Sequence, residues 1–186
     1  MDYRERIIAA YREQASKRGI SRVTMDDLVE LTGISKRTIY RYFRSKDEIV
    51  ESVVTDFLTN VSQKIEAALD PTGSPVDQIS NVIRVITGNI EFVEPFFLYD
   101  LNKYYPHLWE RIEQFRAERV QKVFERVFDS GGQEFFRETH PKIFTTALLA
   151  SIRAVVNPKF IIENQLRAED TIESLFNIFL YGIVKK

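Results

Sequence analysis

The chain has 186 residues, which at roughly 100–200 residues per domain is one domain, or a small module joined to a larger one. It contains no cysteine, which excludes disulfides, iron–sulfur clusters and cysteine nucleophiles. The net charge of −1 is unevenly placed: residues 1–47 carry 11 Lys and Arg against 7 Asp and Glu, whereas the remaining 15 Lys and Arg face 20 Asp and Glu. A basic amino-terminal segment is therefore attached to an acidic body.

Apolar residues recur at helical spacing along the whole chain, and glycine, proline and capping residues separate the segments. This pattern predicts about nine helices and no strand, an all-α fold. The first helix is expected over Arg4–Lys17, two short helices begin after Thr24 and Ser35, and a long helix begins after Ser45. Later helices are expected from residue 75 towards 95, and over residues 96–103, 106–128, 143–156 and 169–183.

The two short helices flank a tight turn that contains Gly33, which is the geometry of a helix-turn-helix. In the second of them Ile39 and Phe43 are expected to pack inward, on Leu28 and Leu31 among others. The remaining side chains suit a DNA groove, because Lys and Arg neutralise phosphates and Arg can hydrogen-bond guanine. They are Lys36, Arg37, Thr38, Tyr40, Arg41 and Tyr42. The alternative is a solvated basic face of a helical bundle.

The run Thr38-Ile39-Tyr40-Arg41-Tyr42-Phe43-Arg44-Ser45-Lys46-Asp47-Glu48-Ile49 resembles the DNA-binding segment of the TetR family of transcriptional regulators. The resemblance covers about residues 4–50, and it implies a helix-turn-helix domain over 1–47 and a ligand-binding and dimerisation domain over 48–186. Arg37 stands where many members have glycine, so it could read guanine directly or only add phosphate affinity. The resemblance implies contacts with phosphate from Thr24, with bases or nearby phosphates from Ser35, Lys36, Arg37 and Thr38, and with the DNA backbone from Tyr40, Tyr42 and Lys46.

The last two long helices are the most apolar in the chain. A terminal helix that is apolar over so much of its surface needs cover on more than one side, and pairing with a second copy about a two-fold axis supplies it. The sequence and the resemblance together predict a homodimer. The predicted interface residues are Leu148, Ile152, Val155, Phe176, Phe179 and Leu180. The alternative is that both helices are core of a monomer.

Aromatic residues are dense between Phe92 and Phe128. Aromatic walls with a few polar tips suit a small-molecule pocket, although the same spacing is typical of a packed core. The candidate pocket residues are Phe57, Val61, Ile83, Tyr99, Tyr104, Trp109 and Phe115.

Catalytic and metal-binding motifs are not found in the sequence. Its two histidines are 33 residues apart, and there is no glycine-rich phosphate loop or nucleophile elbow. We therefore expect no metal, no cofactor and no enzymatic activity. The most apolar stretches are shorter than the roughly 20 residues that span a bilayer, so we expect a cytoplasmic protein with no membrane partner.

These observations predict a homodimeric regulator that binds double-stranded DNA. We expect a repressor, released from a palindromic operator by a small molecule. One alternative is a DNA-binding regulator without a small-molecule effector, controlled by a protein partner or acting architecturally. The other is a helical enzyme or binding module whose basic amino terminus is incidental.

Overall fold

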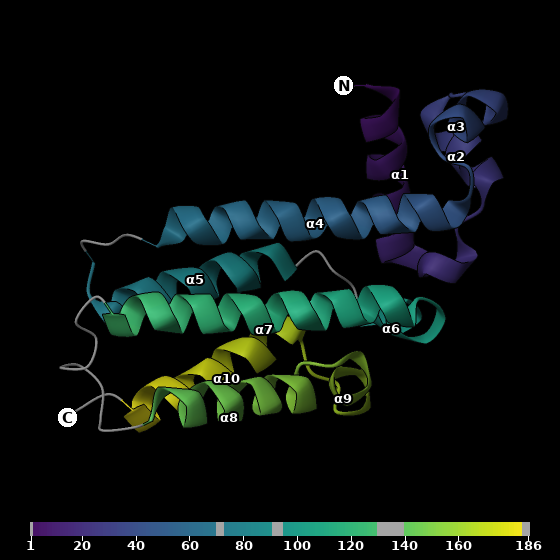
Figure 1. The fold of residues 1–186 in the computed structure, drawn as a ribbon. Coiled ribbons are helices and arrows are strands. Elements are labelled where there is room, and N and C mark those ends of the chain that lie inside the picture. The colour runs from purple at the N-terminus through teal and green to yellow at the C-terminus, as the bar shows by residue number, and fades with distance from the viewer. Residues whose placement is uncertain (1, 70–72, 91–94, 130–139, 184–186) are drawn as a thin grey trace. The chain divides into compact units, whose positions relative to one another are not determined.

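The structure, a computed structural model, describes residues 2–69, 73–90, 95–129 and 140–183. All the regular elements in these ranges are helices, which confirms the predicted all-α fold (Figure 1). In chain order they are α1 Tyr3–Arg18, the 3-10 helix η1 Ile20–Arg22, α2 Met25–Thr32, α3 Lys36–Tyr42, α4 Lys46–Ala68, α5 Pro75–Ile90, α6 Pro95–Tyr104, α7 Pro106–Asp129, α8 Pro141–Val155, α9 Pro158–Glu163 and α10 Ala168–Ile183. None of the helices in these ranges is both long and apolar enough to cross a membrane.

Helix α9 is the α-helix that the sequence pattern missed. Asn157 and Pro158 were expected only to end the preceding helix, yet they also begin a new one. The Asn157 side chain accepts a hydrogen bond from the backbone of Phe160 at 2.9 Å, and Pro158 occupies the first helical position. The described residues therefore contain ten α-helices rather than about nine, because an asparagine cap and a proline serve both as a stop and as a start.

The chain packs into two compact units that do not coincide with the expected boundary at residue 47. The first unit contains the chain up to Thr59 and the described part of Phe92–Glu110, and the second contains the rest. Helices α4 and α7 each contribute residues to both units. Helix α6 belongs to the first unit because it packs on α1 and η1. The functional division of the chain at residue 47 stays a prediction.

The core of the first unit is formed where α1 packs on α2, η1 and α6. Ile7, Tyr11, Leu28 and Ile39 are fully buried there, which confirms the inward positions expected for the two short helices. Leu31 is 49% exposed, so its expected place in this core is wrong. Leu28 and Thr32 lie four residues apart and form the buried face of α2. Leu31 therefore points away from this face.

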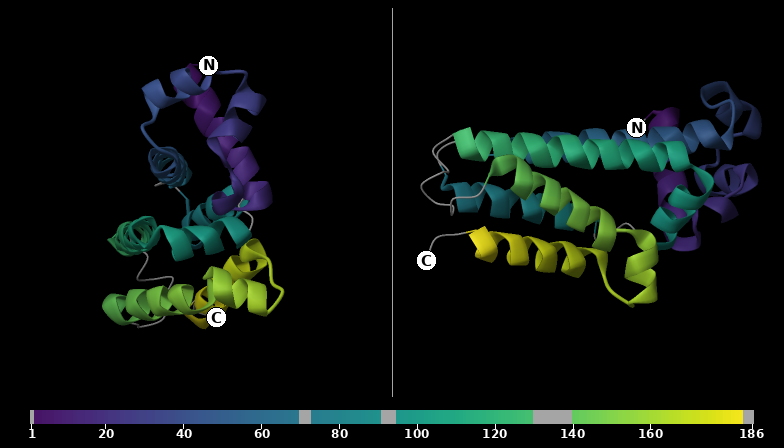
Figure 2. Two further views of the ribbon diagram at one scale, coloured as in Figure 1. Left: turned by 90° about the vertical axis from the view of Figure 1, so that its right-hand side faces the viewer. Right: turned by 60° about the horizontal axis from the view of Figure 1, so that its bottom comes forward.

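The second unit is built on α10, which packs on both α5 and α8, while α9 packs on α8. Figure 2 shows α8 and α10 side by side in its right-hand view. Ile79, Leu148 and Ile161 are at most 2% exposed and lie in this core.

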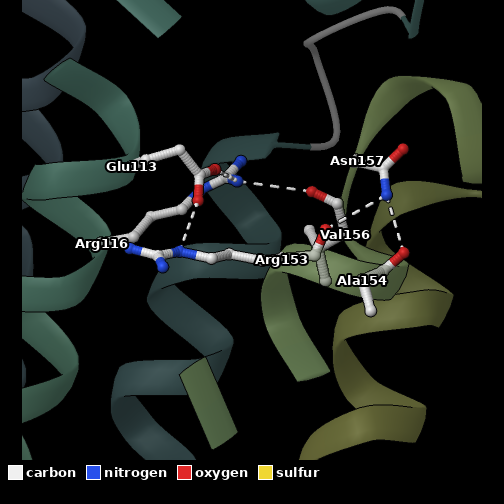
Figure 3. A network of polar contacts seen from close by, with 6 residues as sticks. All are labelled: Glu113, Arg116, Arg153, Ala154, Val156 and Asn157. Carbon is white, nitrogen blue, oxygen red and sulfur yellow. Dashed lines mark hydrogen bonds and ion pairs between the residues drawn. The ribbon is translucent and has the colours of Figure 1, made fainter. Parts of the chain in front are cut away.

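A polar network joins α7 to the end of α8 within the second unit (Figure 3). Glu113 accepts a hydrogen bond from Arg116 at 2.7 Å and pairs with Nε of Arg153 at 3.4 Å. Arg116 also donates to the carbonyl of Val156, the residue that caps α8, and Asn157 donates to the carbonyl of Ala154. Burial lowers the pKa of the Arg116 guanidinium, and the adjacent Glu113 carboxylate acts in the opposite direction. The carboxylate therefore compensates a largely buried cation.

Replacing this carboxylate by an amide is expected to destabilise the second unit. Glu113→Gln should lower the free energy of unfolding by about 1–3 kcal/mol, because charge-assisted hydrogen bonds to a largely buried guanidinium are lost. Urea unfolding at neutral pH measures this, with Glu118→Gln on the exposed face of the same helix as the matched control. Equal stabilities of the two variants would contradict the proposed role of Glu113.

Candidate DNA interface

Local capping fixes the position at which α2 begins. The Thr24 hydroxyl accepts a hydrogen bond from the backbone of Asp27 at 3.1 Å, and the Asp27 carboxylate accepts from the backbone of Thr24 at 2.8 Å. These bonds to Thr24 lower the pKa of the Asp27 carboxyl. The pair satisfies donors at the helix start that have no partner within the helix, so α2 begins at Met25.

The turn between α2 and α3 depends on one glycine. Gly33 has φ +66° and ψ 11°, the left-handed conformation that ends α2, and its backbone N–H donates to the carbonyl of Val29. Thr32 donates to the carbonyl of Leu28 at 2.5 Å, and Ser35 then caps α3 by accepting from the backbone of Thr38 at 3.2 Å. The sequence therefore sets the angle between the two helices over only a few residues.

The two faces of α3 differ in chemistry. Its inward residue Ile39 is fully buried, and Phe43, which follows the helix, is 3% exposed. The outward residues are polar, basic or phenolic, and they belong to the set expected to contact DNA. Lys36, Arg37, Tyr40 and Arg41 are exposed, and Thr38 and Tyr42 are half-buried.

Contacts within the first unit orient several of these side chains. The Lys36 ammonium pairs with Asp26 of α2 at 2.8 Å, and this carboxylate raises the pKa of Lys36. The Arg41 guanidinium lies 5.5 Å from the centre of the Tyr42 ring, which meets the Tyr3 ring edge-on at 6.2 Å. A short, capped helix thus presents cations and phenols outward while its apolar side is fixed in the core.

The segment that contains the helix-turn-helix matches a known protein family. Residues 7–53 match the family described as bacterial regulatory proteins, tetR family. The helix-turn-helix transcriptional regulator YvaF of Bacillus subtilis is 28% identical over 181 residues, which is 96% of this chain and 94% of that protein. Residues 7–53 therefore carry the DNA-binding segment of the TetR family, and the resemblance inferred from the sequence is confirmed. Together with the likeness to YvaF over nearly the whole chain, this match identifies a DNA-binding transcriptional regulator.

Solved structures of similar fold span nearly the whole chain. A transcriptional regulator of Saccharomonospora viridis, solved in complex with choline, has a TM-score of 0.77 at 16% identity and covers 98% of both chains. SmeT, the repressor of a Stenotrophomonas maltophilia multidrug efflux pump, has a TM-score of 0.72 at 16% identity, covering 100% of this chain and 92% of that one. At these identities the likeness establishes the fold alone.

Lys46, which the family resemblance implies to contact the DNA backbone, has partners within the protein instead. The Lys46 ammonium donates to the carbonyls of Ile20, Ser21 and Val23 at 3.1, 3.3 and 3.1 Å. An ammonium has three donors, and all three are directed at η1 and the residue that follows it. A phosphate contact by Lys46 therefore requires one of these hydrogen bonds to break.

The seven candidate pocket residues are divided between the two units. In the first unit Tyr99 and Tyr104 are exposed, and Phe57 and Trp109 are half-buried. In the second unit Val61 and Ile83 are buried, whereas Phe115 is half-buried. Tyr104 lines a hollow of about 370 Å³, whose other lining residues are Ser21, Lys46, Asp47, Tyr105 and His107. Phe92, at the start of the aromatic stretch, lies outside the described residues, and a shared pocket stays a prediction.

The residues predicted to form a dimer interface lie mostly in the interior. Of these six, Leu148, Ile152, Phe176 and Leu180 are buried within their own chain, and Val155 and Phe179 are half-buried. Both helices are apolar over much of their surface, so the sequence pattern did not separate the inward face from the outward one. The exposed apolar residues are instead Ile143 of α8 (67%) and Ile178 and Tyr181 of α10 (69% and 79%).

The hydrogen bonds that join α6 to η1 could not be predicted from the sequence. Asp100 accepts from both the backbone and the hydroxyl of Ser21, which lies 79 residues away in the chain.

In the described residues no cluster of three or more His, Asp or Glu side chains is arranged to hold a metal ion.

Proposed function

We propose that this chain is a homodimeric repressor that reads a palindromic operator and is released by a small molecule. The proposal rests on the outward face of α3, where Lys36, Arg37, Tyr40 and Arg41 are exposed to solvent. Arginine hydrogen-bonds guanine in the major groove, and lysine and tyrosine contact phosphates. We assign bases or nearby phosphates to the amino-terminal half of α3 and the DNA backbone to its later tyrosines.

The amino terminus of α2 is the second part of the proposed DNA contact. Thr24 is exposed, and its backbone and side chain lie at a capped helix start, where N–H groups and the helix dipole favour an anion. A phosphate placed there would fix the orientation of the first unit on the duplex without reading its sequence.

We propose that the exposed stripes of α8 and α10 form the dimer interface. On α8 the stripe runs through Ile143, Ala147 and Ala150, and on α10 it runs through Ile178 and Tyr181. Small residues allow close approach of two helices, and the large exposed side chains need cover from water. A second copy is the occupant that a palindromic operator requires, because it places two α3 helices about 34–36 Å apart.

A small-molecule effector is supported by one protein of similar fold and by the aromatic residues named above. The Saccharomonospora viridis regulator of similar fold was solved with choline bound. We propose that the effector contacts residues among the seven candidates named above. An effector that binds better to one conformation than to the DNA-bound one shifts the population away from DNA. Helices α4 and α7 each contribute residues to both units, and we propose that one of them carries this coupling.

Repression can be measured with a reporter gene. The DNA sequence that the chain selects is placed across the reporter's promoter, and expression is compared with and without the chain. We expect expression to fall in its presence, because a bound dimer blocks polymerase. Unchanged or increased expression would contradict repression.

The effector is tested separately, with choline and a small-molecule library as probes. Compounds that raise the melting temperature of the chain are added to the chain–DNA complex, and fluorescence anisotropy reports release. We expect at least one stabilising compound to weaken DNA binding at least tenfold. Stabilising compounds that leave DNA affinity unchanged would favour a regulator controlled by a protein partner.

A further inference from the structure

The short segment between α1 and α2 is held almost entirely by side chains from other helices. A three-residue 3-10 helix satisfies few of its own backbone groups. Tyr11 of α1 donates to the carbonyl of Ile20 at 3.2 Å, and Lys46 of α4 donates to the carbonyls of Ile20, Ser21 and Val23. The position of η1 therefore depends on contacts from outside it.

Helix α6 supplies the contact that involves a carboxylate. Oδ2 of Asp100 accepts from the Ser21 backbone at 3.0 Å and from the Ser21 hydroxyl at 2.9 Å. The approach is close: a Cβ added to Gly19, which has φ +87°, would lie 2.7 Å from this oxygen. A glycine at the end of α1 is thus needed both for the backbone conformation and for the space that the carboxylate occupies.

A second contact joins the residue after α6 to the start of α4. The Tyr105 hydroxyl donates to Oδ1 of Asp47 at 2.7 Å, next in the chain to Lys46. Burial and the Asp47 carboxylate raise the pKa of Tyr105, so the phenol keeps its proton and remains a donor across the physiological range. Helix α6 and the residue that follows it are therefore attached to η1 at Ser21 and to α4 at Asp47.

We propose that Asp100 is a positioning residue for DNA binding. Ser21 lies three residues before Thr24, and the chain between them is held at Val23 by Lys46. By fixing Ser21, Asp100 fixes the place at which α2 begins, and hence the phosphate contact assigned to Thr24. This inference rests on the DNA contacts proposed above.

The test is a double-mutant cycle on operator affinity, using the full-length dimer and DNA obtained by selection. Asp100→Ala alone is expected to weaken binding about five- to tenfold, and Thr24→Ala by a similar factor. The double variant should be no more than twofold weaker than Thr24→Ala, because Asp100 acts through Thr24. Asn102→Ala, an exposed residue of the same helix, is the matched control and should bind like the wild type.

A second readout separates positioning from a general loss of stability. Hydrogen exchange at the Ser21 amide should accelerate at least tenfold in Asp100→Ala, because its acceptor is gone, while exchange in the core of α1 stays slow. Asp100→Asn keeps one acceptor oxygen and should recover part of both effects.

Three outcomes overturn the inference. If Asp100→Ala binds the operator like the wild type, or if its effect adds fully to that of Thr24→Ala, Asp100 does not act through the start of α2. In either case a weakened Thr24→Ala leaves the proposed DNA interface intact. If Thr24→Ala itself binds normally, both the proposed phosphate contact and this inference fail.

Discussion

Replacing Lys36 and Arg37 together by alanine is expected to weaken operator binding about 100-fold or more. A good bidentate arginine–guanine contact is worth about 1–3 kcal/mol, each phosphate contact adds to affinity, and about 1.4 kcal/mol corresponds to a factor of ten. Folding should change little, because both side chains are exposed and the Lys36–Asp26 pair lies on the surface. Fluorescence anisotropy with operator DNA and with an unrelated duplex measures the effect.

The two residues are then distinguished by single variants. If Arg37 reads guanine, Arg37→Ala should lose affinity for the operator while its affinity for the unrelated duplex falls less. If Arg37 only contacts phosphate, both affinities should fall together. Arg84→Ala removes an exposed arginine from α5 in the second unit and serves as the charge-matched control. Wild-type affinity in the Lys36 and Arg37 double variant would rule out α3 as the DNA-reading helix.

Aspartate at both Ile178 and Tyr181 is expected to convert the proposed dimer to a monomer. Both side chains are largely exposed in the single chain, so the substitutions should change the stability of the monomer little. In a two-fold interface they introduce four carboxylates, and desolvating an unpaired ion costs several kcal/mol. Sedimentation velocity should give the 21.8 kDa of one chain for the variant and twice this mass for the wild type.

Loss of the dimer should carry over to DNA binding. A monomer contacts one half-site, so operator affinity should fall by at least 100-fold while single half-site affinity is kept. Leu166→Asp changes an exposed apolar residue between α9 and α10 and is the matched control. A variant that still sediments as a dimer would place the interface on another surface.

Local signals in the sequence were sufficient to predict the helix-turn-helix. The caps at Thr24 and Ser35, the turn at Gly33 and the inward position of Ile39 all depend on residues within about four positions of each other, and the structure has them as expected. Leu31 was misplaced because α2 is short and apolar on more than one side.

Contacts between distant segments could not be predicted in the same way. Nothing near Asp100 in the sequence indicates that it accepts hydrogen bonds from Ser21, and nothing near Lys46 indicates its three carbonyl partners. The outward face of α10 was also undetermined, because apolar residues such as Phe176 and Ile178 occur on both of its sides. Only packing against α5 and α8 separates the buried residues from the exposed ones.

Selection of bound sequences from a random DNA duplex pool at two salt concentrations tests whether the chain reads a palindromic operator. We expect enrichment of a palindrome whose two half-sites are about one helical turn apart, with the palindrome retained at the higher salt concentration. Weak binding without sequence preference, abolished by the modest rise in salt, would contradict it. The basic face of α3 would then be a source of electrostatic attraction alone.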